Sequence, residues 1–117
     1  MERVRTRISW THRQYLYSAL PEEHTMKFGY GLLTGQRPLG SSSTYEDVYE
    51  EMLELAAMAE KYGFDTVHTS EHHFFDDGYS PSVLPLSAAI ARETETIGIG
   101  TSIALAPLYD PIRLAED

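Results

Sequence analysis

The segment SEHHFFDDG, Ser70 to Gly78, holds the side chains of this sequence that are best suited to chemistry. Glu71, His72 and His73 follow directly after a β-branched and aromatic run that is typical of a β-strand. Three interpretations are open. The residues could bind a metal, because imidazole and carboxylate are ligands for zinc and iron. One imidazole could instead carry acid/base chemistry, or both rings could cap the strand end by bonding to backbone.

The alternation of side chains along a strand limits which of these groups can act together. On an extended chain, His72 shares a face with His68 and Ser70, whereas His73 shares the other face with Glu71. Adjacent ligands cannot easily reach one ion, so the metal site is the less favoured interpretation. His68 stands in the middle of the predicted strand and is expected to be a hydrogen-bonded core histidine.

The elements around this segment predict an α/β domain. The predicted strands are residues 27–33, 64–70 and 96–105, and the predicted helices are residues 45–62, 84–95 and 111–117. Thr44 and Asp47 form an approximate capping box before the first helix, and Gly63 is suited to end it. The order βαβαβα predicts parallel strands with right-handed crossovers. Both doubly wound sheets and (β/α)8 barrels start in this way, and both place ligands at the carboxyl ends of the strands.

Composition and charge exclude several classes of protein. Residues 26–117 carry 15 acidic and 5 basic side chains, and residues 1–25 carry 3 and 4, which gives −10 + 1 = −9 for the chain. Such an acidic body repels phosphate backbones, so nucleic acid is not an expected partner. A salt-adapted cytoplasm and an ordinary acidic protein explain the charge equally well. The absence of cysteine excludes disulfides.

The N-terminal segment differs from the rest of the chain. Residues 1–25 lack clear periodicity, and Met26 opens MKFGYGLL as a natural protein start would. We therefore expect residues 1–25 to be an extension that is dispensable or disordered, and residues 26–117 to be a partial barrel domain. No apolar run suits a membrane span or a secretory signal, so a cytoplasmic location is expected. The whole chain is under half the roughly 250 residues of a closed barrel.

Two stretches carry a resemblance to a known family. GFDTVHTSEHHF and the later PLSAAIARETETIGIGTSIALAPLYDPIRLAED resemble the N-terminal part of the bacterial-luciferase-like flavin-dependent oxidoreductases, which are (β/α)8 TIM barrels. The resemblance implies the βαβαβα portion of such a barrel, incomplete in this chain. It also implies a monooxygenase or oxidoreductase that acts on a small organic substrate with oxygen and reduced FMN, or with F420. EHHF looks more like the FMN-using branch. The implied partners are the substrate, a flavin reductase and, for the complete protein, further subunits in a homo- or hetero-oligomer.

The resemblance also assigns roles to residues. His72 matches the family's catalytic histidine, which would assist proton transfer or stabilise an oxygenated flavin. Glu71 matches a carboxylate that shapes the site. Ser102 and Ile103 match a pair under the flavin ring where the family often has a non-proline cis peptide. The family's phosphate-binding residues come from later strands, so this chain alone is expected to be inactive.

Two other classes of function stay open at this point. The chain could be a truncated, non-catalytic remnant or an interaction module that folds only with partner chains. It could also, with less support, be part of a metal-dependent barrel hydrolase that uses His72 or His73.

Overall fold

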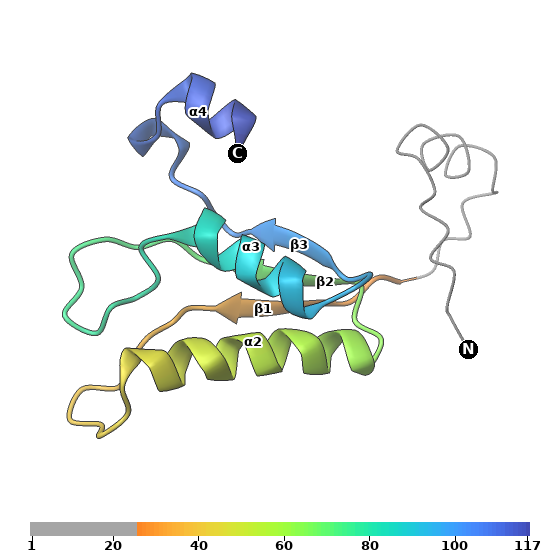
Figure 1. Ribbon diagram of the computed structural model, residues 1–117, viewed down its shortest axis with the longest axis horizontal. Helices are drawn as coiled ribbons and strands as arrows, with labels where there is room; N and C mark the ends of the chain where they lie inside the picture. Colours follow the sequence, from red (N-terminus) through yellow and green to blue (C-terminus); the bar gives the residue numbers. More distant parts are fainter. Residues whose placement is uncertain (1–25) are drawn as a thin grey trace, which may run out of the picture.

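The computed structural model describes residues 26–117, and the predicted N-terminal extension lies outside these described residues. The elements, in chain order, are β1 (Gly29–Leu33), α2 (Tyr45–Lys61), β2 (Thr66–Thr69), α3 (Val83–Glu93), β3 (Gly98–Thr101), the 3-10 turn η1 (Ala106–Leu108) and α4 (Pro111–Glu116). This order confirms the predicted alternation of strands and helices (Figure 1). The short turn η1 was not predicted.

The three strands form one parallel sheet in the order β1-β2-β3. His68 lies at its centre, opposite Gly31 on one side and Gly100 on the other. The β1–β2 register shifts between Gly31 and Leu33, so Leu32 forms a bulge at the carboxyl end of β1. Bulges of this kind often occur next to active sites.

Strand β3 is shorter than predicted. It ends at Thr101 rather than at Leu105. Ser102 still donates its amide to the Thr69 carbonyl at 2.6 Å, but the Leu105 amide donates to the side chain of Glu71 instead of to a strand. The apolar character of residues 102–105 therefore belongs to a loop at the carboxyl end of the sheet.

Local signals set both ends of helix α2. The Asp47 amide donates to the Thr44 hydroxyl at 3.1 Å, and the Thr44 amide donates to the Asp47 carboxylate at 2.7 Å, which is the predicted capping box. Gly63 follows the helix with a φ of +82°, as a helix-ending glycine should. The predicted helix included Tyr62, but α2 ends at Lys61 and Tyr62 is 70% exposed. None of the helices in residues 26–117 is both long and apolar enough to cross a bilayer.

Helices α2 and α3 pack against the same face of the sheet and against each other. Val67 from β2 and Ile90 from α3 are fully buried between these layers. The residues that pack around them include Leu33, Val48, Met52, Ala56, Ala59, Leu86 and Ile97. A sequential parallel sheet with its helices on one side is the start of a barrel, whereas a doubly wound sheet has helices on both faces.

Glu60, near the end of α2, accepts hydrogen bonds from the segment that joins α3 to β3. Its carboxylate accepts the backbone amides of Thr96 at 2.6 Å, Ile97 at 2.9 Å and Glu95 at 3.0 Å. The amides of Thr96 and Ile97 are the main reason that the pKa of Glu60 falls to about 2. This contact fixes the amino end of β3.

Candidate active site

Glu71 joins the two loops that follow β2 and β3. Its side chain is buried, with one carboxylate oxygen accepting the Leu105 amide at 2.7 Å and the other in contact with His73 Nε2 at 2.8 Å. The Tyr109 hydroxyl also hydrogen-bonds to this carboxylate. One acidic side chain thus holds together backbone and side chains from two neighbouring strand ends.

These contacts keep Glu71 ionised despite its burial. Burial alone would raise the pKa of Glu71, but the hydrogen bonds from the Leu105 amide, His73 and Tyr109 prevail and hold the pKa below its usual range. The pKa of Tyr109, in contrast, is raised by burial and by its hydrogen bond to Glu71. The site therefore contains a buried anion at neutral pH.

The two adjacent histidines have different surroundings. His73 pairs with Glu71, as the predicted alternation of faces requires. His72 points into an aromatic cluster, where its ring stacks on Tyr79 with centroids 3.6 Å apart and an interplanar angle of 20°. The two imidazoles do not converge, and residues 26–117 contain no group of three His, Cys, Asp or Glu side chains placed to hold an ion. His73 bonds to a carboxylate rather than to backbone, so the strand-cap interpretation does not describe it.

Ser102 and Ile103 lie directly after β3. The peptide bond between them is cis, in agreement with the resemblance, and the Gly31–Leu32 bond at the end of β1 is cis as well. The side chain of Ile103 is 70% exposed and that of Leu32 is 50% exposed. Apolar side chains are thus presented at the carboxyl ends of both outer strands, on either side of the loop that carries His72.

His68 occupies the centre of the sheet face that α2 and α3 leave uncovered. Nε2 lies 3.1 Å from the Thr66 hydroxyl, which confirms the predicted hydrogen bond, but the ring is only half-buried and lies outside the core, where it was predicted to be. A Cβ on Gly100 would lie 2.9 Å from the His68 ring. The absence of a side chain at Gly100 therefore permits the backbone of β3 to pack closely against His68.

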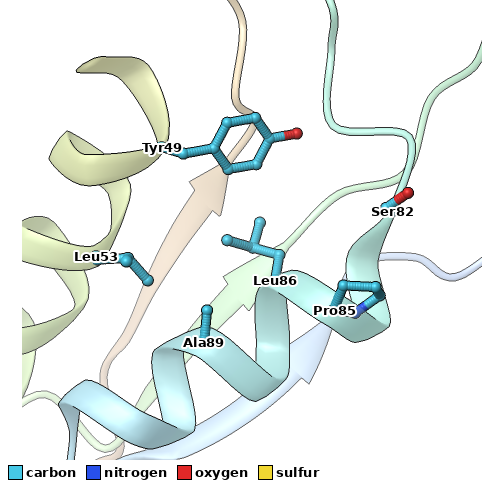
Figure 2. A pocket seen from close by; sticks show the side chains of 6 residues that line it. All are labelled: Tyr49, Leu53, Ser82, Pro85, Leu86 and Ala89. Atoms are coloured by element: carbon cyan, nitrogen blue, oxygen red, sulfur yellow. The ribbon is translucent and has the colours of Figure 1, made fainter. Parts of the chain in front are cut away.

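A shallow apolar groove of about 340 Å³ lies between α2 and α3 (Figure 2). Its lining residues are Tyr49, Leu53, Ser82, Pro85, Leu86 and Ala89. The predicted site residues Glu71, His72, Ser102 and Ile103 do not line it. This groove and the candidate site are therefore separate features.

Sequence reasoning missed Tyr79 and Tyr109 as members of the site. Tyr79 is joined to its partner His72 by a loop, and Tyr109 is 38 residues from Glu71, so neither contact could be read from the period of a helix or a strand. The only available signal was the Asp-Asp-Gly turn, which returns the chain toward His72. In this turn Gly78 has a φ of +85° and donates its amide to the Phe75 carbonyl at 3.2 Å.

The fold and the site together define this chain as part of a (β/α) barrel whose functional side chains lie at the carboxyl edge of the sheet. Comparison with known proteins shows which family of barrel proteins this chain belongs to. A model described as luciferase-like monooxygenase matches residues 26–117. The chain therefore belongs to the luciferase-like monooxygenase family.

Several characterised relatives have names that state a reaction or cofactor. The alkanal monooxygenase alpha chain of Photorhabdus laumondii is 35% identical over 92 residues, covering 79% of this chain and 25% of that protein. The oxygenase component of a flavin-dependent trigonelline monooxygenase from Acinetobacter baylyi is 29% identical over 88 residues, covering 75% and 24%. An F420-dependent glucose-6-phosphate dehydrogenase from Microbacterium testaceum is 39% identical over 62 residues, covering 50% and 18%.

A solved structure of another monooxygenase has a similar fold. The crystal structure of the monooxygenase RslO1 from Streptomyces bottropensis superposes with a TM-score of 0.68 at 35% identity, covering 77% of this chain and 27% of that one. The fold is therefore the N-terminal portion of the barrel that the family shares. The chain spans about a quarter of the length of these longer relatives.

Proposed function

We propose that the protein carrying this chain is a flavin-dependent monooxygenase that oxidises a small organic substrate with reduced FMN and oxygen. The observation that carries this proposal is the grouping of His72, the buried anion Glu71 and the Ser102–Ile103 segment at the carboxyl ends of β2 and β3. Membership of the luciferase-like monooxygenase family supports it. A flavin reductase that supplies the reduced cofactor is the partner that this function would require.

The residues at this edge fit the ring system of a flavin, which is flat and apolar on its faces and polar at its rim. Ile103 and Leu32 offer exposed apolar surface. The Ser70 hydroxyl, next to Glu71, is buried and has no hydrogen-bond partner within residues 26–117. The site for the phosphate is proposed to lie outside this chain.

FMN is the favoured cofactor, and F420 is the alternative. The EHHF sequence and the flavin-dependent relative from Acinetobacter favour FMN. The relative from Microbacterium, whose name states F420 dependence, keeps the alternative open. A titration that compares the two cofactors would decide between them.

Each residue of the site then has a role. A bound reduced flavin supplies the electrons for the reaction with oxygen. His72 holds or transfers a proton on a ring nitrogen beside the flavin, which is a role that one imidazole can fill without a metal ligand set. Glu71 keeps the loops after β2 and β3 in register with each other. Ser102 and Ile103 support one face of the ring.

The test compares His72→Ala with His73→Ala in the full protein that carries this chain. Turnover is measured with reduced FMN, oxygen and a panel of alkanals, alkanesulfonates and aminopolycarboxylates. We expect His72→Ala to lose about 10²- to 10⁴-fold in turnover, with FMN affinity retained because the phosphate is bound elsewhere. An active His72→Ala with an inactive His73→Ala would reverse the assignment of the two histidines. Equal loss in both variants would favour a metal site instead.

A further inference from the structure

The ring of His72 is oriented by aromatic contacts rather than by a carboxylate. His73 takes the Glu71 carboxylate, which leaves His72 stacked on Tyr79 at 3.6 Å and 20°. Phe75 packs edge-on against both rings, at 6.0 Å from His72 and 5.3 Å from Tyr79. The two edge-on contacts of Phe75 have a favoured aromatic geometry, while the rings of His72 and Tyr79 lie nearly face to face.

Tyr79 is itself held in place by the loop around it. The turn before it is clamped to the β1–α2 loop, since the Arg37 amide donates to the Asp77 carbonyl at 2.9 Å and the Gln36 side chain donates to the Asp77 carboxylate at 2.9 Å. A Cβ on Gly78 would collide with the Tyr45 ring, so this turn packs closely against α2. After Tyr79, Ser80 is fully buried. Tyr79 therefore offers a fixed surface for the imidazole.

We propose that Tyr79 is a positioning residue, whose ring stacks on His72 and holds the imidazole in its working orientation at the carboxyl edge of the sheet. The inference rests on the proposed function, because it assigns Tyr79 to the same site. Tyr79 makes no chemical step of its own, and its hydroxyl is not required. What it supplies is the flat face of the ring.

The first readout is independent of turnover. In a ¹H–¹³C NMR spectrum, the Cε1 proton of His72, assigned by its loss in His72→Ala, should be shifted upfield by the ring current of the stacked Tyr79 ring. Tyr79→Phe should keep this shift and Tyr79→Leu should remove it. An unchanged His72 signal in Tyr79→Leu would overturn the inference.

The second readout separates positioning from binding. Tyr79→Leu should lower kcat by about 2- to 12-fold, the range that corresponds to one stacked aromatic pair. The KM for reduced FMN should not change, and Tyr79→Phe should behave as the wild type. Tyr62→Leu is the matched control, since Tyr62 is an exposed tyrosine at the end of α2. If Tyr79→Leu does not fold, Tyr79→Met fills a similar volume without a ring face and serves in its place.

The double variant His72→Ala/Tyr79→Leu completes the test. If Tyr79 acts through His72, the double variant should be no slower than His72→Ala alone. An additive loss, or an equal loss in Tyr79→Phe and Tyr79→Leu, would show that Tyr79 acts in another way. Full activity in both His72→Ala and His73→Ala would instead refute the site on which the proposed function rests, whereas an inactive His72→Ala beside a fully active Tyr79→Leu would refute only the positioning role.

Discussion

Replacing Glu71 by alanine should loosen the loop after β3 without unfolding the sheet. The Leu105 amide would lose a 2.7 Å hydrogen bond to a charged acceptor, and His73 would lose its 2.8 Å contact. Both contacts lie at the end of β2, away from the buried residues that α2 and α3 pack against the sheet. The expected effect is therefore local opening of residues 102–109.

The magnitude follows from the Leu105 contact. A hydrogen bond to a charged group contributes about 1.5–3 kcal/mol. If that free energy is lost from local opening, exchange of the Leu105 amide hydrogen should accelerate by about 10- to 160-fold. Glu71→Gln keeps a carbonyl acceptor of the same length, so its effect should be smaller than that of Glu71→Ala.

The assay is hydrogen–deuterium exchange on the full protein, read by mass spectrometry from a peptide that covers residues 102–109. Glu54→Ala is the control, because Glu54 is an exposed glutamate on α2. Hydrogen exchange of residues 102–109 in Glu54→Ala should match that of the wild type. Unchanged exchange in Glu71→Ala would refute the reasoning, since it would mean that Glu71 does not hold this loop.

The other predictions concern the scaffold. Glu60 has a pKa of about 2 in the folded protein against 4.5 for the free side chain, so its stabilising contact is complete above pH 4.5 and is lost as the pH falls from 4.5 toward 2. Glu60→Gln should flatten this acid dependence in the hydrogen exchange of the Thr96 and Ile97 amides. An unchanged pH profile in Glu60→Gln would contradict this prediction. Ile90→Ala should lower the free energy of unfolding in urea by about 2–5 kcal/mol because the side chain is fully buried, whereas Ile112→Ala, at 71% exposure, should have little effect. Removing residues 1–25 should change neither the thermal midpoint nor FMN affinity in matched long and short proteins, and a lower midpoint in the short form would show that this segment packs on the domain.

The sequence predicted the elements well where local chemistry determines them. The capping box of Thr44 and Asp47 and the glycine that ends α2 depend only on neighbouring residues, and both formed as expected. The parallel pairing followed from the βαβ order. The end of β3 was predicted poorly, because a tertiary contact from Glu71 withdraws the Leu105 amide from the sheet.

The candidate site was predictable in its location but not in its contacts. Alternation along the chain correctly separated His72 from Glu71 and joined Glu71 to His73. It could not indicate which ring would stack on His72, because Tyr79 returns to the site only through the turn at Gly78. Nor could it show that Glu71 would reach across to the loop after β3. Such contacts depend on the relative placement of two strand ends, which local patterns do not encode.

The most direct test of the central claim is a fluorescence titration of the full protein with FMN and F420, repeated on two matched variants. Ile103→Asp places a carboxylate where the flavin ring is proposed to lie, and Met26→Asp places one at the opposite, amino-terminal end of the sheet, where Met26 is 78% exposed. We predict that the wild type binds FMN more tightly than F420 and that Ile103→Asp weakens binding by at least about tenfold, since a carboxylate loses its hydration beneath an apolar ring. Met26→Asp should bind as the wild type does. Binding of neither cofactor, or equal affinity in the wild type and Ile103→Asp, would contradict a flavin site at the carboxyl edge of this sheet.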